Sequence, residues 1–339
     1  MKEVEDRGEG RACLQPGILR RAPVHRQVYL PRHPDSATIF LELQTGGVDW
    51  TGLTPLQYTR QTGSDYFRKN YNKFRYPSFG FTYMGYNLSD PKFSDARVRR
   101  AINFAVNKKE MIDTLFYGLA RETTGPFLPD SWAYNGDVNP APYDPAAARS
   151  LLAEAGWADS DGDGWLEKGG KEFEFTVLVN QGNAERQRTA EMIQGYLKAV
   201  GIRVKIRVLE WSALINDFLN KKRFEAVVMG WSLARDPDNF DIWHSSKTRE
   251  GEFNFIGYNN PEVDRLLEEG RRTFDQARRE AIYHRIHEVL YDEQPYLFLY
   301  TADALPIVNS RFRNVEASPI GIGFNFIRWY VPEGEQKYR

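Results

Sequence analysis

The middle of the chain alternates twice between strand-like and helix-like segments, and this alternation most constrains the fold. Every second residue is apolar in 173–179 and again in 202–208, which is the period of a strand with one buried face. An apolar stripe between them predicts a helix that Asn183 caps and Gly201 ends. A second helix, at about 212–220, leads to a third strand at 224–229. The order is β-α-β-α-β.

This order predicts an α/β fold with three parallel strands. Helical crossovers between parallel strands are nearly always right-handed, so the segments that follow the strands open at one edge of the sheet. Ligands of open α/β sheets bind at that carboxyl edge. The turn 180–182 and the loop 230–238 follow two of these strands, and we therefore expect a binding site there.

The flanking sequence contains further helices and buried strands. Residues 121–143 are rich in Pro, Gly and Asn, which is typical of a long connection over a functional surface. Helices are predicted at 37–44, from a cap at Ser94, at 107–118, 145–156, 260–270 and 276–291, and strands at 48–51, 79–86 and 296–300, with hairpin-like sequence to Tyr330.

The charge balance excludes several classes of protein. The 339 residues include 45 Lys and Arg against 46 Asp and Glu, so no net field attracts nucleic acid or an anionic membrane. No apolar run is long enough to span a bilayer. Residues 1–34 are charged and interrupted by Gly and Pro, without the apolar core of a secretory signal, and we expect them to be poorly ordered. Cys13 has no partner for an internal disulfide.

Two motifs suggest metal binding and have simpler explanations. Asp159–Gly164 matches the opening of a calcium loop, but the twelfth position is Gly170 where a bidentate Glu belongs, so a tight turn is favoured over a metal site. His284 and His287 lie three residues apart on a predicted helix. The apolar stripe of that helix predicts that both face solvent, and no metal ligand is assigned.

No catalytic motif is present in the sequence. It lacks a Gly-x-Ser-x-Gly elbow and a phosphate loop that ends in Lys-Ser or Lys-Thr, which favours a non-enzymatic protein without a cofactor. The alternating Arg203, Lys205 and Arg207 are explained by one solvent-facing side of a strand.

Candidate ligand contacts lie in and near the 230–238 loop. Trp231 follows the third strand, and we expect it to line a cleft. Asp236 has two explanations: it pairs with a ligand amine, or it caps a helix whose first residue is Pro237, and capping is favoured. The predicted ligand-binding residues are Trp231, Ser232, Leu233, Ala234, Arg235, Asp236, Asn254 and Tyr258.

Several stretches resemble one family. They are Phe93–Ala101, Leu151–Trp157 with its Asp-Gly-Asp-Gly turn, Gly230–Ser232, Ile242–Ser245, Asn254–Asp264 and Gln294–Tyr296. Over about residues 35–332 the chain resembles the extracytoplasmic solute-binding proteins that deliver oligopeptides, dipeptides and nickel to ABC transporters. The form of the Trp231 loop is similar to that of oligopeptide binders.

The resemblance implies a periplasmic-binding-protein-like fold in which two lobes enclose the ligand. Residues 35–85 then form part of lobe I, 86–303 form lobe II, and 304–339 return to lobe I. The family's long amino-terminal half has no counterpart, so we expect a truncated first lobe and weakened closure.

The resemblance also implies function. It implies capture of peptides for ABC transporter permease subunits in the periplasm, although no signal peptide is recognised in the chain. In peptide-binding relatives an aspartate shortly after the Gly-Trp pair often holds the ligand's amino group. Here the loop is shorter and Ala234 and Arg235 occupy that neighbourhood, and Asp236 is the nearest candidate for this role. Two alternatives remain: a cytoplasmic ligand-sensing regulator of the same fold, for which residues 1–35 offer no helix-turn-helix, and a metal-dependent hydrolase.

Overall fold

The computed structural model describes residues 10–12, 28–30 and 36–337. Contacts divide the chain into unit 1, which ends at Pro77 and resumes at Asp303, and unit 2, which comprises Ser78–Ala302. The first boundary therefore lies before the expected division at residues 85 and 86. The reason is that the strand at 80–86 pairs within the sheet of unit 2.

Unit 2 contains one mixed sheet with the strand order β11-β10-β12-β6-β13, and β7 pairs with β13. β10 is parallel to both β11 and β12, which confirms the predicted β-α-β-α-β arrangement. β6 lies antiparallel between β12 and β13. The strands are β6 (Gly80–Tyr86), β7 (Ala120–Glu122), β10 (Glu174–Asn180), β11 (Arg203–Leu209), β12 (Ala226–Ser232) and β13 (Tyr296–Ala304).

The crossover helices begin and end as their sequence predicts. The side chain of Asn183 accepts a hydrogen bond from the Arg186 amide, and Gly201 has the positive φ of a residue that ends a helix. The second crossover is short, and its last part, Leu214–Leu219, is π-helical. The helices are α3 (Ala96–Ala105), α4 (Lys108–Phe116), α5 (Pro145–Glu154), α6 (Ala184–Lys198), α7 (Trp211–Ala213), α8 (Phe240–Trp243), α9 (Pro261–Arg272) and α10 (Gln276–Glu293).

Two helix ends differ from the prediction. Asp95, and not Ser94, caps α3, because its carboxylate accepts the Arg97 amide. α9 does not end at Gly270 but continues to Arg272. Gly270 is explained by packing, because a side chain at this position would be crowded by the Tyr283 ring.

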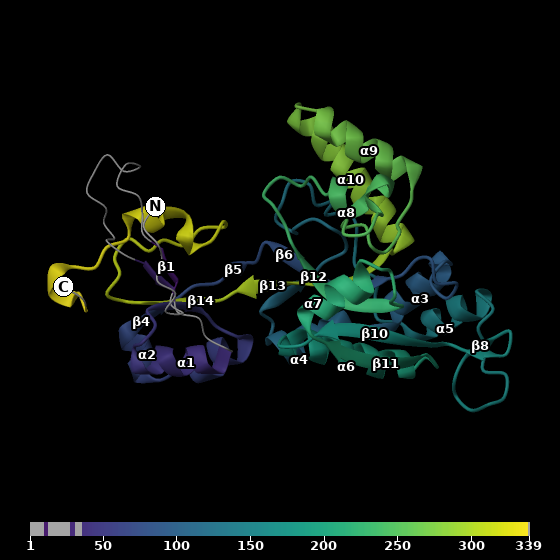
Figure 1. Cartoon of the computed structure of the whole chain (residues 1–339), viewed down its shortest axis with the longest axis horizontal. Coiled ribbons are helices and arrows are strands. Elements are labelled where there is room, and N and C mark those ends of the chain that lie inside the picture. Colours follow the sequence, from purple (N-terminus) through teal and green to yellow (C-terminus); the bar gives the residue numbers. More distant parts are fainter. Residues whose placement is uncertain (1–9, 13–27, 31–35, 338–339) are drawn as a thin grey trace. The chain divides into compact units, whose positions relative to one another are not determined.

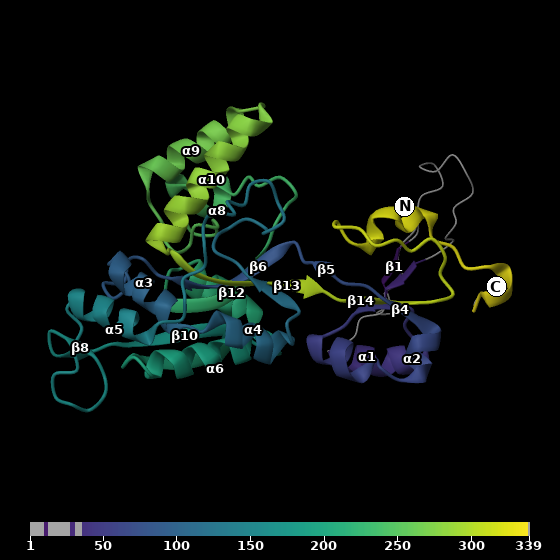
Figure 2. The same cartoon turned by 180° about the vertical axis from the view of Figure 1, so that it is seen from behind.

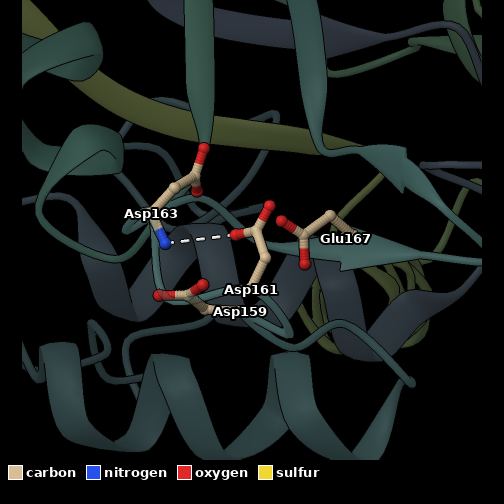
Figure 3. A group of neighbouring side chains, drawn as sticks. All are labelled: Asp159, Asp161, Asp163 and Glu167. Carbon is tan, nitrogen blue, oxygen red and sulfur yellow. Dashed lines mark hydrogen bonds between the residues drawn. The ribbon is translucent and has the colours of Figure 1, made fainter.

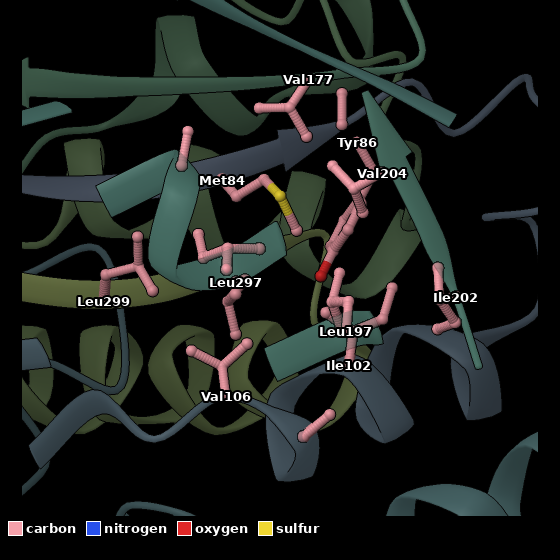
Figure 4. Packing of buried hydrophobic residues seen from close by; sticks show 14 of the residues in the cluster. Met84, Tyr86, Ile102, Val106, Val177, Leu197, Ile202, Val204, Leu297 and Leu299 are labelled. Atoms are coloured by element: carbon pink, nitrogen blue, oxygen red, sulfur yellow. The ribbon is translucent and has the colours of Figure 1, made fainter. Parts of the chain in front are cut away.

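Helices cover both faces of the sheet (Figures 1 and 2). On one face α3, α4, α5 and α6 enclose a hydrophobic core, and on the other α8, α9 and α10 enclose a second core. Figure 4 shows the first core, whose labelled members are Met84, Tyr86, Ile102, Val106, Val177, Leu197, Ile202, Val204, Leu297 and Leu299. Burial on both faces explains the continuous apolar run of β13.

Unit 1 is smaller and has its own sheet, in the order β3-β14-β4, all antiparallel. Trp329 packs with Val308 and Ile322 in its core. β1 pairs antiparallel with β2, while the rest of the predicted poorly ordered segment, Cys13 included, lies outside the described residues. The elements are β1 (Gly10–Ala12), β2 (Val28–Leu30), α1 (Ser36–Thr45), β3 (Trp50–Gly52), a π-helical turn (Gln57–Gln61), α2 (Asp65–Asn70), β4 (Tyr71–Lys73), β5 (Tyr76–Pro77), β14 (Pro306–Asn309) and 3-10 turns (Ile322–Arg328, Glu333–Glu335).

His287 on α10 is fully buried, so the prediction that it faces solvent is wrong. The connection 121–143 covers this face of the helix: the Asn135 amide donates to Nδ1 of His287 at 3.1 Å, and Nε2 lies 2.9 Å from Oγ1 of Thr124. Because Nδ1 accepts, the ring is neutral and donates from Nε2. His284 remains partly exposed and contacts the Trp132 carbonyl.

Burial of His287 predicts a specific loss of stability in acid. Desolvation lowers the pKa of His287 from 6.5 to about 4 in the folded protein, so the unfolded chain binds a proton first as the pH falls through this range. Between about pH 7.5 and about pH 4.5, we expect wild type to lose about 2–3 kcal/mol more unfolding free energy than His287→Gln. Urea unfolding at both pH values measures this difference.

His284→Gln is the matched control, because His284 lies on the same helix and remains partly exposed. It should retain the acid sensitivity of wild type. Equal losses of stability in wild type and His287→Gln would contradict the assignment of a buried, neutral His287.

Candidate functional site

The carboxyl end of β12 positions the aromatic residue that sequence analysis singled out. β12 continues beyond the predicted end at Met229, because Trp231 and Ser232 pair with Phe81 and Gly80 of β6. The loop thus begins at Leu233, and Trp231 is held by the strand. A side chain on a strand is positioned more rigidly than one on a loop.

Trp231 belongs to an aromatic group on the face of the sheet that α8–α10 cover. Its ring stacks toward Tyr83 at a centroid distance of 6.3 Å and meets the ring of Phe253 edge-on at 5.4 Å. Its Nε1 donates to the hydroxyl of Tyr296 at 3.3 Å. Trp231 is partly exposed and Phe253 is 52% exposed, so the two rings offer apolar surface at the strand end.

The loop after Trp231 divides into exposed and structural residues. Ser232, Ala234 and Arg235 are exposed and Leu233 is half-buried. Asp236 accepts two hydrogen bonds from the Arg279 guanidinium, at 2.8 and 2.9 Å, and one from the Asp238 amide. The hydrogen bonds from Arg279 lower the pKa of Asp236.

The prediction that Asp236 caps a helix beginning at Pro237 is wrong. Residues 233–239 form no helix, and the next helix, α8, begins at Phe240. Asp236 instead ties the loop to α10 through Arg279. Its carboxylate is therefore already paired where the family pattern places a ligand amine.

Asn254 and Tyr258 are buried and make hydrogen bonds within unit 2. The Asn254 side chain is fully buried, donates to the carbonyls of His244 and Tyr258, and accepts from the Tyr258 amide. Tyr258 is buried and its hydroxyl donates to Glu293 at 2.5 Å. Both side chains form their hydrogen bonds inside unit 2, so in this structure their polar groups have a structural role.

Two residues that were not predicted as contacts, one from β10 and one from α6, meet at the end of β10. Asn180 is the last residue of β10, and its Oδ1 accepts a hydrogen bond from Nη1 of Arg186 at 3.0 Å. The sequence did contain a signal for Asn180, because the turn 180–182 was predicted to open at the carboxyl edge of the sheet. Arg186 could not be predicted in the same way, because its guanidinium reaches the strand ends only through the conformation of a long side chain.

Four carboxylates gather in the turn that precedes β10, far along the chain from Trp231 (Figure 3). Ligand atoms of Asp159, Asp161, Asp163 and Glu167 all lie within 4.8 Å of one another, a donor set that suits a hard cation such as Ca²⁺. Glu167, to which sequence analysis assigned no role, occupies the ninth position of the loop. All three aspartates also accept loop amides, for example Gly162 to Asp159 at 2.7 Å, so the group forms a tight turn by itself.

Comparison with known proteins identifies the family. Residues 23–252 match the model of bacterial extracellular solute-binding proteins, family 5 Middle. The chain is 32% identical over 302 residues to the oligopeptide-binding protein AppA of Bacillus subtilis, a match that covers 88% of this chain and 54% of AppA. It is 25% identical over 306 residues to heme-binding protein A of Haemophilus influenzae, covering 89% of this chain and 53% of that protein.

A solved structure agrees with the sequence matches. The structure of Bacillus subtilis AppA in complex with a nonapeptide superposes with a TM-score of 0.84 and 30% identity, covering 97% of this chain and 65% of AppA. The chain therefore belongs to the bacterial extracellular solute-binding proteins of family 5, which bind solutes and are not enzymes. It has the mixed α/β fold of periplasmic binding proteins.

Two further facts bear on function. The chain spans about half the length of the curated relatives it matches, 54% of AppA and 53% of heme-binding protein A. Among the described helices, none combines the length and the apolar composition that crossing a membrane requires.

The carboxylate group at Asp159–Glu167 generates a prediction about calcium. We expect about 1 mM Ca²⁺ to raise the melting temperature by less than about 2 °C, since the loop has Gly170 where a bidentate ligand belongs, and a ligand near its Kd adds only about 0.4 kcal/mol. Differential scanning calorimetry with Ca²⁺ and with EDTA measures the shift.

Asp161→Asn is the control for this prediction. A rise of several degrees in wild type that disappears in Asp161→Asn would contradict weak binding and would establish a calcium site.

Proposed function

We propose that this protein captures peptides, and oligopeptides in particular, for import by an ABC transporter. The single observation that carries this proposal is the likeness to the oligopeptide-binding protein AppA in both sequence and structure. We further propose that capture takes place outside the cytoplasmic membrane, in the periplasm, because the family is extracellular. The permease subunits of the transporter are its proposed partners.

The proposed ligand contacts lie at the carboxyl edge of the unit 2 sheet. Trp231 and Phe253 provide apolar surface for a peptide side chain, and residues 232–235, of which Ser232, Ala234 and Arg235 are exposed, are the proposed contacts of an extended peptide. Asp236 has a supporting role in this proposal, since Arg279 already pairs with it. Asn254 and Tyr258 hold the surrounding loop.

Native mass spectrometry of the protein purified from cells tests the ligand class directly. A retained peptide, followed by calorimetry with a nonamer peptide library, is the expected result. Haemin is the competing probe, because heme-binding protein A is also a relative of this chain. Binding of haemin without binding of any peptide would overturn the proposed function.

Replacing Trp231 tests the proposed wall of the site. Trp231→Ala is expected to weaken peptide binding by about 1–3 kcal/mol, because an aromatic contact at a binding site is lost. The fold should persist, since the ring is partly exposed and the backbone pairing of β12 with β6 does not involve the side chain. Isothermal titration calorimetry and far-UV circular dichroism measure the two effects.

Trp165→Ala is the matched control. Trp165 is also partly exposed and packs beside Arg203, the first residue of β11, at the opposite ends of the strands. Its replacement should leave the affinity unchanged. Loss of the folded state in Trp231→Ala would instead show that Trp231 is a core residue.

A further inference from the structure

An arginine reaches across the ends of two parallel strands beside the proposed peptide site. Arg186 lies in the first turn of α6, and its Nη1 donates to Oδ1 of Asn180 at the end of β10. Its Nη2 lies over Gly230 of β12: a Cβ added there would be 3.0 Å from Nη2 and 3.0 Å from the Phe81 carbonyl. Glycine at this position thus leaves room for the guanidinium at the end of β12, on the α6 side of the sheet and on the face opposite to the Trp231 ring.

The charge of Arg186 has no carboxylate partner in the part of the chain that the structure describes. The side chain is partly buried, and burial lowers the pKa of the guanidinium. Besides burial, the groups that act on the pKa of Arg186 are the hydroxyls of Tyr83 and Tyr300. Glu185 is the neighbour in sequence, but it forms no ion pair with Arg186 at 4.0 Å or less.

Arg99, a second arginine of unit 2, differs from Arg186 in its hydrogen-bond partners. Arg99 is more deeply buried than Arg186, but its guanidinium donates to the backbone carbonyls of Phe93, Ser94, Glu293 and Gln294, and these bonds give it a structural role. The identified hydrogen bond of Arg186 leads to a neutral amide oxygen. Its position is also unfavourable for a cation, because the amino terminus of a helix carries partial positive charge.

A partly desolvated cation without a counter-charge is costly unless an anion arrives. A guanidinium presents its donors in a planar fork that matches a carboxylate. An arginine held at the strand ends where the ligand is proposed to bind is therefore suited to a carboxylate on that ligand.

We propose that Arg186 binds a carboxylate of the captured peptide and is a specificity-determining residue of the site. The carboxylate has two sources, the carboxyl terminus of the peptide or an acidic side chain. This inference rests on the proposed function and adds a chemical requirement to it.

Calorimetry with three nonamer libraries tests the inference and separates the two sources. The first library has free carboxyl termini and no acidic residues, the second is the same but carboxy-amidated, and the third is amidated and contains one Glu. Wild type should bind a carboxylate-bearing library about 10- to 100-fold more tightly than the neutral second library. A preference for the first identifies the terminal carboxylate, and a preference for the third identifies the side chain.

In Arg186→Gln this preference should disappear, while binding of the neutral library changes less than about threefold. Arg188→Gln is the matched control, because Arg188 lies on the same helix and is exposed, so the net charge changes equally. It should retain the preference.

Asn180→Asp is the second variant, and it keeps the inference testable if Arg186→Gln does not fold. It places a carboxylate beside the guanidinium within the protein, where Oδ1 of Asn180 lies 3.0 Å from Nη1. The internal ion pair should reduce the preference about tenfold or more without removing Arg186.

The outcomes separate this inference from the proposed function. Peptide binding that shows no preference for a carboxylate, or a preference that Arg186→Gln and Asn180→Asp both retain, overturns the role of Arg186 and leaves the proposed function intact. If no library binds to wild type, the proposed function is overturned and the inference with it.

Discussion

The pairing of β6 with β12 is the interaction on which the rest of the structure depends. β6 joins the parallel half of the sheet to β13, and it is the first strand of unit 2 along the chain. The pairing runs over seven residues, from Ala226 with Tyr86 to Ser232 with Gly80. A Cβ at Gly80 would lie 2.3 Å from the Trp231 carbonyl, so glycine is required where the two strands end together. This register holds Trp231 at the carboxyl end of β12, within the sheet whose two faces are covered by helices.

Local sequence determined much of the fold, because periodicity and helix caps act within a few residues. The three parallel strands, the capped start of α6 and the carboxyl edge were all predictable from residues 173–229. The exact end of β12 was not, since it depends on β6, more than a hundred positions earlier in the chain. The burial of His287 was missed for the same reason: a distant connection covers a helix face that its own sequence marks as polar.

The candidate site was predictable in location and less so in the roles of its residues. Trp231 lies where strand order placed it. Asn254 and Tyr258 belong to stretches that carried the family resemblance, but their hydrogen bonds show that they stabilise the 243–258 loop. Residues that stabilise a loop can be as characteristic of a family as residues that bind its ligand. A sequence motif by itself therefore does not show which of the two roles a residue has.

Asp236 and Arg186 both lie near the carboxyl ends of the strands, but in the described part of the chain only Asp236 has a partner of opposite charge. Asp236 is an anion whose charge Arg279 of α10 neutralises through two hydrogen bonds. Arg186 is a cation near the same strand end, with a neutral amide as its identified partner. An internal counter-charge satisfies a group before ligand arrives, whereas an uncompensated charge gains most from a ligand of opposite sign. At this edge of unit 2 the charge without an internal partner among the described residues is therefore positive, which supports the proposal that the ligand presents an anionic group there.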